Sequence, residues 1–414
     1  MDSASKRFSL RAKNRLLLTW LHKARRGNCT VKTKLLVVSH ACVTPINQSF
    51  YVSVEEATGW EVELVVPLVW ATEYEEKVPY KRWHNFKGKI HPIPVWNGGH
   101  IPLHIYKNTF VRLLKSANPT AIYMHHEPYG LATLQVYLAN RLATNVPIGF
   151  YAAQNIAKVY PPPFRWSEHY VFRRSSFAFP VAQGALDVLR AKGYVGKADV
   201  LPLPLDLEVY RSRPKWAAAK RSELGIGPDE FVVGYLGRLV EEKGLRSLLL
   251  ATAMLRAANP KPWRCVLVGS GPYETELRAV AADLGINERV IFVGFVPHEE
   301  APGWFSLFDL FVLPSETRPK WKEQFGRVVV EANACGTAVI GTDSGEIANV
   351  VKSTGGGLIV PEGDSATLSQ TILALMGDPI HMQELAGQGI RSAREQYDQR
   401  CLAQRFAAGI ESIL

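Results

Sequence analysis

Cysteine is scarce in this 414-residue chain, and its five residues are scattered. No C-x-x-C pair occurs, so the sequence offers neither a zinc-binding cysteine cluster nor a disulfide framework. Long apolar runs are also missing, because no stretch approaches the roughly 20 residues that a helix needs to cross a bilayer. We therefore expect no integral membrane protein and place the chain in a reducing cytoplasm. The cysteines are Cys29, Cys42, Cys265, Cys335 and Cys401.

Acidic residues are almost absent from the first 34 positions, where Asp2 is the only one. Ten lysines and arginines give this arm a net charge of +9, which leaves the rest of the chain almost neutral. The high overall charge is therefore no sign of a nucleic-acid groove in the body of the protein. The ten basic residues are Lys6, Arg7, Arg11, Lys13, Arg15, Lys23, Arg25, Arg26, Lys32 and Lys34.

On a helical wheel the arm collects Leu10, Trp20 and other apolar residues on one side and arginines on the other. This pattern is typical of a helix that lies on an anionic membrane surface. Two other interpretations stay open, namely a solvated basic tail and a transit peptide, which is also rich in arginine and poor in acids.

The remaining sequence alternates short β-rich runs with helical stretches, as doubly wound parallel sheets require. The length is too great for one ordinary core, so we predict two domains. A proline-stiffened connection around residue 205 separates them. We expect the arm at 1–34, domains at 35–205 and 206–381, and a helical segment at 382–414. The strands expected in the first domain are 34–38, 61–66, 121–124, 147–151 and 177–181; a second series begins at Phe231.

Two carboxylates, Glu323 and Glu331, stand eight residues apart across a predicted junction of loop and helix. The stretch 327–335 is a mostly apolar helix that Gly336 ends. Its N-terminus near Phe325 offers unpaired N–H groups to a phosphate. The first carboxylate can then accept hydrogen bonds from the hydroxyl groups of a sugar. The second, about two helical turns further along, can reach a ribose.

Three further segments occur in a fixed order before this one. They are Phe231 to Leu239 followed by Glu242-Lys243-Gly244, then 266–272, then 290–296. Together the four segments resemble the retaining glycosyltransferases of family 4 and their E-x7-E signature. The resemblance covers roughly the C-terminal half and implies an α/β protein of the GT-B fold, with two Rossmann-like parallel-sheet domains facing across a cleft.

The resemblance also implies roles for individual residues. Arg238 and Lys243, which flank a turn after the first strand, would neutralise a departing nucleoside diphosphate. Glu323 would position the donor sugar rather than act as a nucleophile. The nucleobase would meet main-chain groups at Val296. We predict catalytic roles for Arg238, Lys243, Glu323 and His126, and substrate contacts for Gly237, Val296, Gln324, Phe325, Gly326 and Glu331.

The segment His125-His126-Glu127 follows a strand of the first domain and so points toward the same cleft. Vicinal histidines could suggest a metal, but adjacent residues of an extended chain face opposite ways, so we predict no metal site. The resemblance implies that one of these residues touches the donor sugar or the acceptor, and we favour His126. We expect Gln154-Asn155 and the segment 160–163 to shape the acceptor site.

The chain departs from the family pattern in two places. The glycine pair that usually follows the first strand is replaced by residues 39–48, so the family's acceptor contact there is not carried over. The second glycine pair is represented by Ser344-Gly345, followed by Glu346. The Gly269-x-Gly271 pair lacks the third glycine of a dinucleotide fingerprint, because Glu274 stands there, so NAD is not implied.

The expected function is a retaining, metal-independent transfer of a sugar from a UDP- or GDP-linked donor to a glycan or lipid-linked acceptor. We expect no further cofactor and no nucleic-acid partner. Surface polysaccharide, lipopolysaccharide or glycolipid synthesis fits a cytoplasmic protein whose arm reaches the inner face of the membrane. Three alternatives stay open: an epimerase or a phosphorylase of the same fold, and a non-catalytic subunit that binds sugar nucleotides.

Overall fold

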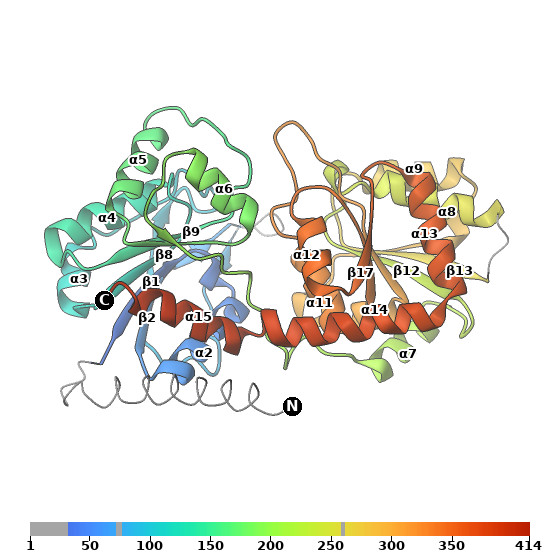
Figure 1. Ribbon diagram of the computed structural model, residues 1–414, viewed down its shortest axis with the longest axis horizontal. Coiled ribbons are helices and arrows are strands. Elements are labelled where there is room, and N and C mark those ends of the chain that lie inside the picture. The colour runs from blue at the N-terminus through green and yellow to red at the C-terminus, as the bar shows by residue number, and fades with distance from the viewer. Residues whose placement is uncertain (1–31, 72–76, 258–260) are drawn as a thin grey trace, which may run out of the picture. The chain divides into compact units, whose positions relative to one another are not determined.

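A computed structural model describes residues 32–71, 77–257 and 261–414. Two parallel sheets of seven and six strands dominate these described ranges (Figure 1). The predicted interfacial helix of the arm lies outside the described residues. Lys34, counted above with the arm, is the first residue of strand β1, where its ammonium group pairs with Glu61 and Glu63.

The N-terminal domain is built on the seven-stranded sheet, whose order is β11-β10-β9-β8-β1-β2-β5. All five strands predicted from the sequence are present, and β5 and β11 extend the sheet at its two edges. The strands are β1 (Lys34–Ser39), β2 (Glu61–Pro67), β5 (Ile90–Ile93), β8 (Ala121–His125), β9 (Ile148–Ala152), β10 (Phe177–Pro180) and β11 (Lys197–Ala198).

Two short antiparallel hairpins, β3 (Val69–Trp70) with β4 (Val78–Pro79) and β6 (Val95–Trp96) with β7 (Ile105–Tyr106), follow β2 and β5. They fill the long connections to the next strands of the sheet. The helices of this domain are α2 (Ser49–Thr58), α3 (Val111–Ala117), α4 (Leu131–Ala143), α5 (Phe164–Arg174) and α6 (Gln183–Ala191).

The C-terminal domain is built on the six-stranded sheet, in the order β14-β13-β12-β15-β16-β17. The chain begins at the central strand β12, moves out to β14 and returns to the other side at β15, which is doubly wound topology. The strands are β12 (Phe231–Leu236), β13 (Trp263–Val268), β14 (Val290–Gly294), β15 (Leu310–Leu313), β16 (Ala338–Thr342) and β17 (Gly357–Val360).

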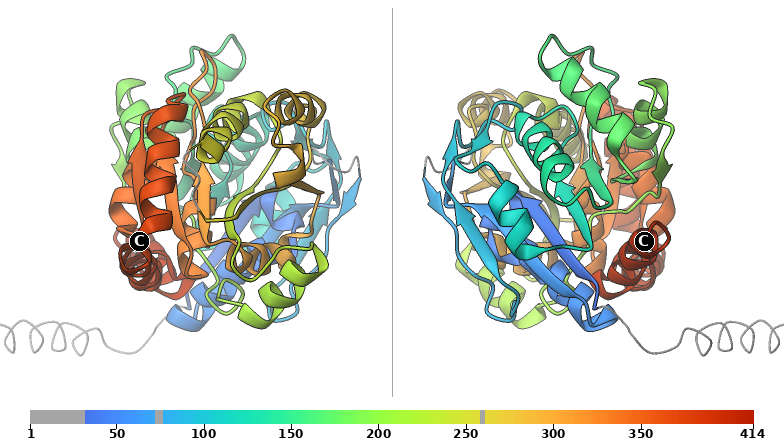
Figure 2. Two further views of the ribbon diagram at one scale, coloured as in Figure 1. Left: turned by 90° about the vertical axis from the view of Figure 1, so that its right-hand side faces the viewer. Right: turned by 90° about the vertical axis from the view of Figure 1, so that its left-hand side faces the viewer.

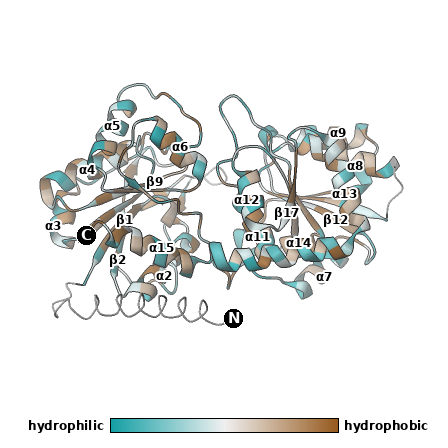
Figure 3. Ribbon diagram, viewed as in Figure 1, coloured by the Kyte–Doolittle hydropathy of each residue, from teal (hydrophilic) through white to brown (hydrophobic). Residues whose placement is uncertain are grey.

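Helices lie on both faces of the sheets, as Figure 2 shows. The strands are the most hydrophobic segments and the helices turn polar residues outward (Figure 3), which is the pattern of sheets buried on both faces. The C-terminal domain contains α7 (Pro214–Glu223), α8 (Leu245–Ala257), α9 (Glu274–Asp283), α10 (Ala301–Leu307), α11 (Arg327–Ala334), α12 (Ile347–Thr354), α13 (Ser365–Gly377) and α14 (Pro379–Ser392).

The chain ends in a helix that packs on the N-terminal domain. After α14, a π-helical turn (Ala393–Tyr397) leads into α15 (Gln399–Glu411), which lies against α2. Phe406 of α15 packs edge to face on Phe50 and Tyr123, with ring centroids 5.6 and 5.0 Å away. Burying such an aromatic side chain contributes about 1.5 to 3 kcal/mol, so the last helix is a structural part of the first domain.

The two crossings between the domains run side by side. Leu205, in the proline-rich connection, donates its N–H to the carbonyl of Tyr397 at 2.8 Å and accepts the N–H of Gln399 at 3.0 Å. These hydrogen bonds tie the outgoing connection to the returning one. No helix in the described ranges is long and apolar enough to cross a membrane.

Candidate active site

The ends of the central strands of the C-terminal domain approach one another more closely than side chains would permit. Gly237 follows β12 and Gly269 follows β13, and the N–H of Gly237 bonds to the carbonyl of Val268 at 2.9 Å. A Cβ on Gly269 would lie 1.8 Å from the carbonyl oxygen of Gly237, and its φ of +134° also favours glycine. The two glycines therefore allow the two loops to approach each other this closely.

These loops form one wall of a cleft that encloses about 1050 Å³, including the space at its open mouth. Gly237 and Val296, both predicted substrate contacts, lie in that wall together with Gly269. Thr44 and Val78 of the N-terminal domain line the opposite side. Arg238 directly follows Gly237, and its side chain is exposed. The structure thus brings Gly237 and Val296 to one cleft between the two domains, with Arg238 next in sequence to its wall.

Lys243 and Glu323 form an ion pair at the next loop of the same domain. The ammonium Nζ lies 2.6 Å from Glu323 Oε2, and the side chains are only 18% and 14% exposed. The hydroxyl of Ser315 donates to the same carboxylate oxygen at 3.3 Å. The Lys243 ammonium also lies 5.0 Å from the centre of the Trp321 ring. A cation and a carboxylate held this closely can face a phosphate and a sugar hydroxyl at once.

The three residues after Glu323 take different positions. Gln324 is exposed, whereas the ring of Phe325 is 5% exposed and packs near Tyr397, with ring centroids 6.2 Å apart. The predicted contact of Phe325 with substrate can therefore come only from its main chain. Gly326 caps α11 in a left-handed conformation, with a φ of +79°. The predicted helix N-terminus is present, at Arg327.

Glu331 lies on α11 and is 3% exposed, as an apolar helix implies. Its Oε1 is 2.8 Å from Nε of Arg327, one turn earlier, but neither atom makes a hydrogen bond of good geometry. Since a buried unpaired carboxylate is costly, Arg327 offsets part of that cost by charge. Arg327 is thus the basic neighbour of Glu331, and contact of Glu331 with a ribose stays a prediction.

Sequence reasoning missed two residues near Glu331. His298 lies in the wall of the cleft, and its Nε2 is 2.7 Å from the hydroxyl of Tyr210. Burial and the charge of Glu331 raise the pKa of Tyr210, so its hydroxyl stays protonated. The available signal was the position of His298, which lies two residues after the segment 290–296 that the resemblance singles out.

His126 lies inside an aromatic cluster rather than on an open surface. It is 2% exposed; its Nδ1 is 3.1 Å from Nδ1 of His40 and its Nε2 is 3.4 Å from the Tyr106 hydroxyl. His104 packs on it with ring centroids 5.0 Å apart. Burial and the neighbouring imidazoles hold the pKa of His126 well below its usual value. Its side chain is neutral, and a catalytic role for it stays a prediction.

This histidine cluster predicts an acid-sensitive fold. Burial lowers the pKa of His104 from 6.5 to about 4. Below pH 6.5, His104 is therefore protonated in the unfolded chain but still neutral in the folded chain. Stability is then lost as the pH falls, by about 2 kcal/mol per such histidine between pH 6.5 and 5. Urea unfolding at both pH values would measure this slope, and His104→Asn should reduce it. An unchanged slope in the variant would contradict the assignment.

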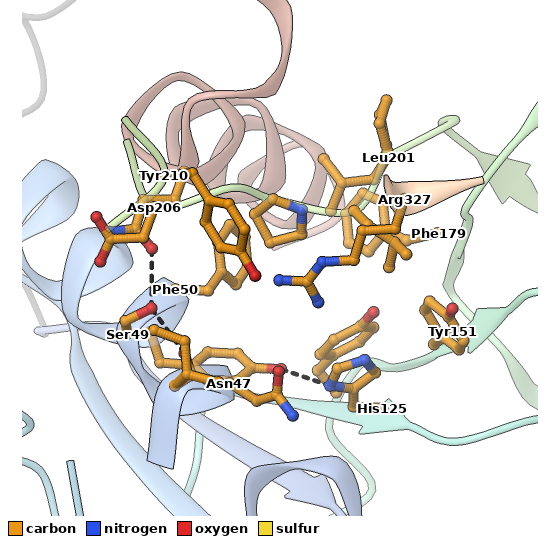
Figure 4. Close-up of a pocket in the computed structure, with 17 residues that line it drawn as sticks. Asn47, Ser49, Phe50, His125, Tyr151, Phe179, Leu201, Asp206, Tyr210 and Arg327 are labelled. Carbon is orange, nitrogen blue, oxygen red and sulfur yellow. Dashed lines mark hydrogen bonds between the residues drawn. The ribbon is translucent and has the colours of Figure 1, made fainter. Parts of the chain in front are cut away.

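His125 faces the other way, toward a pocket at the junction of the domains (Figure 4). Its Nδ1 is 3.2 Å from the hydroxyls of both Ser39 and Tyr51. The guanidinium group of Arg327 reaches into the same pocket from the C-terminal domain. The opposite orientations of His125 and His126 are those expected of adjacent residues in an extended chain, here at the end of β8. Within the described ranges, no group of three His, Cys, Asp or Glu side chains could hold a metal ion.

The loops expected to shape the acceptor site lie beside these histidines. Glu127 accepts the N–H of Ala153 at 2.8 Å, and burial raises the pKa of this carboxyl to about 7. It thereby holds the start of the loop that contains Gln154. Tyr160 stacks on Tyr129 with ring centroids 4.3 Å apart. Both loops are held by contacts within the N-terminal domain.

Two parallel-sheet α/β domains with their loops around one cleft are the GT-B architecture. The solved structure of Anabaena Alr3699/HepE in complex with UDP superposes on this chain with a TM-score of 0.70 at 19% identity. The match covers 92% of this chain and 100% of the other. Sucrose-phosphate synthase from Thermosynechococcus elongatus matches with a TM-score of 0.68 at 19% identity, over 92% of this chain and 99% of the other. The predicted GT-B fold is confirmed.

The family follows from the C-terminal domain. Residues 217–395 match the family described as glycosyl transferases group 1. The C-terminal domain therefore belongs to this family, which is family 4 of the glycosyltransferases and uses nucleotide-sugar donors.

One relative in sequence matches well beyond this domain. The chain is 27% identical to the 2-deoxystreptamine glucosyltransferase of Streptomyces kanamyceticus over 292 residues, which are 69% of this chain and 70% of that protein. It is 32% identical to a GDP-mannose-dependent alpha-(1-6)-phosphatidylinositol monomannoside mannosyltransferase of Mycolicibacterium smegmatis over 209 residues. That second match spans 50% of this chain and 54% of the relative, so it covers about half of each protein.

Proposed function

We propose that the protein is a retaining, metal-independent hexosyltransferase that moves a sugar from a UDP- or GDP-linked donor to a glycan or lipid-linked acceptor. The observation that carries the proposal is the ion pair between Lys243 and Glu323, 2.6 Å long, in the same domain as the cleft wall that contains Gly237 and Val296. A cation and a carboxylate at this point suit the two halves of an activated sugar, namely its diphosphate and its hydroxyls.

In this mechanism the acceptor hydroxyl attacks the anomeric carbon from the same face from which the nucleoside diphosphate departs. The bond to the diphosphate breaks as the bond to the acceptor forms, and the leaving phosphate takes the acceptor proton. Arg238 and Lys243 stabilise the negative charge that develops on the diphosphate, together with N–H groups at Gly326. Glu323 holds the sugar, which Gln324 and the main chain of Phe325 flank. Glu331 accepts hydrogen bonds from the ribose hydroxyls.

The acceptor we favour is amphiphilic, and the support for it is indirect. The mannosyltransferase of Mycolicibacterium smegmatis carries phosphatidylinositol monomannoside in its name. The basic arm adds a second reason, since its composition fits an anionic surface. A lipid-linked or surface-polysaccharide intermediate therefore suits this chain better than a soluble metabolite, and a peripheral position on the inner face of the membrane follows.

The arm gives a direct prediction. Full-length protein should bind vesicles that contain anionic phosphatidylserine more tightly than a chain of residues 32–414, because each basic residue near the surface contributes about 1 kcal/mol. Vesicle sedimentation at two salt concentrations would measure this difference, and neutral phosphatidylcholine vesicles are the control. Equal binding by the two chains would remove the membrane role of the arm.

A screen of UDP-, GDP- and ADP-sugars by thermal shift tests the proposal without knowledge of the acceptor. The matching donor should raise the melting temperature, because a ligand that binds only the folded state stabilises it. Incubation with acceptor mixtures then separates the possible reactions. Transfer releases a nucleoside diphosphate and an extended acceptor, whereas an epimerase or a phosphorylase would not extend one. Stabilisation without any turnover would indicate a non-catalytic subunit.

A further inference from the structure

Two hydrogen bonds connect the N-terminal domain to the C-terminal domain, one at Glu323 and one at Glu346. The side-chain amide of Asn155 donates from Nδ2 to the backbone carbonyl of Glu323 at 2.8 Å. The backbone N–H of Gly184 donates to Oε1 of Glu346 at 2.9 Å. Both donors belong to loops or helix ends of the first domain, and both acceptors belong to the second.

Glu346 links these two contacts into one network. Its own backbone N–H donates to the same carbonyl of Glu323 at 3.1 Å. The carbonyl of Glu323 therefore accepts one bond from each domain. The other carboxylate oxygen of Glu346 accepts the side-chain amide of Asn349 at 3.0 Å. With 6% exposure, Glu346 is a buried carboxylate whose two oxygens are both satisfied.

The two N-terminal-domain residues of this network, Asn155 and Gly184, are constrained by their surroundings. Asn155 is 3% exposed, and it follows Ala153, whose N–H is fixed by the Glu127 carboxylate at 2.8 Å. Gly184 lies in the first turn of α6, where N–H groups lack partners inside the helix and attract a carboxylate. A Cβ on Gly184 would lie 2.2 Å from Oε1 of Glu346, so no other residue fits without a shift.

A glycine in the second domain also permits a close contact in this network. A Cβ on Gly345 would lie 2.1 Å from the Glu323 carbonyl oxygen, and its φ is +57°. The sequence departs from the family's glycine pair at this point, and the structure gives the residue that follows, Glu346, a partner in the other domain. The departure therefore coincides with an interdomain contact.

We propose that Asn155 and Glu346 are positioning residues that fix the loop of Glu323, and that the N-terminal domain thereby sets the place of the sugar-binding carboxylate. This inference rests on the proposed function, since it needs Glu323 to hold the donor sugar. Neither residue touches the reacting atoms. A donor that binds through its diphosphate alone would not sense the network, whereas correct placement of the sugar for attack would require it.

The test compares Asn155→Ala, Glu346→Ala and Glu346→Gln with the wild-type full chain. Loss of one such hydrogen bond should lower kcat about tenfold while the donor KM stays within about twofold. Glu346→Gln keeps an oxygen that can accept the Gly184 N–H, so it should restore most of the activity. Gly184→Ala should resemble Glu346→Ala, and Gly377→Ala, where a Cβ meets no atom within 4 Å, is the matched glycine control.

Hydrogen exchange gives a second readout that does not depend on turnover. The amides of residues 322–326 should exchange faster in Asn155→Ala and Glu346→Ala than in wild type, while UDP and GDP affinities stay unchanged. Wild-type kcat and exchange in both alanine variants would overturn the proposal, and so would a Glu346→Gln variant as impaired as Glu346→Ala. Failure of the proposed function is distinguishable, because wild-type protein would then turn over none of the tested donors while exchange still reports on the network.

Discussion

Lys243→Ala is expected to lower turnover by on the order of 10² to 10³, by analogy with the loss of one group that stabilises a developing oxyanion. The lysine side chain is mostly shielded from solvent, so its charge acts at lower effective dielectric than a surface charge. The variant loses this cation from the diphosphate and also leaves Glu323 without its ion-pair partner. Steady-state kinetics with the matching donor would measure kcat and KM separately.

An exposed lysine provides the control for this experiment. Lys352 lies on α12 and is exposed, so Lys352→Ala should leave kcat unchanged within about twofold. The same assay on Arg238→Ala tests whether the exposed guanidinium next to Gly237 also stabilises the diphosphate. We expect a loss of turnover of similar size. Turnover within a few-fold of wild type in Lys243→Ala would contradict the role assigned to the lysine.

Glu323→Ala is the second large prediction, with a loss of kcat that again reaches on the order of 10² or more. The carboxylate is bound by Lys243 and by Ser315, and it is the group expected to hold the sugar hydroxyls. Binding of free UDP or GDP should change little, because neither contains the sugar. Calorimetric titration of the nucleotide and kinetic assays of the sugar donor, run side by side, would separate these two effects.

The double variant measures the coupling of the two charges. Since residues in direct contact are not additive, Lys243→Ala combined with Glu323→Ala should be far less impaired than the product of the single losses. Glu331→Gln makes a useful comparison, because this carboxylate has a different basic neighbour in Arg327. Fully multiplicative losses for Lys243 and Glu323 would show that the two side chains act independently.

The parts of the fold that sequence reasoning predicted are those specified by local patterns. The buried strands of both domains, such as Leu35 to Val38, are short continuous apolar runs, which identify parallel strands covered on both faces. The helix expected at 327–335 from its apolar composition and from Gly336 is present as α11 (Arg327–Ala334), and Gly336 has a φ of +86°. The short edge strands β5 and β11 were missed because they have only four and two residues.

The parts of the site that escaped prediction depend on residues far apart in the chain. His126 was singled out, but its partners His40 and His104 come from other loops, and nothing local indicates that the three imidazoles pack together. The contact between Gly184 and Glu346 joins residues that are 162 positions apart. Phe325 shows a related limit, since its ring fills the core and its predicted substrate contact stays a prediction for its main chain alone.

The return of α15 to α2 has a practical consequence for any dissection of the molecule. Because Phe406 completes the aromatic core around Phe50, a chain cut near residue 205 yields an N-terminal fragment that lacks its own final helix. Either half could be isolated intact only by two cuts, or by grafting residues 399–411 onto the first half through a new linker. A reporter fused to the last residue would likewise report on movements of the N-terminal domain.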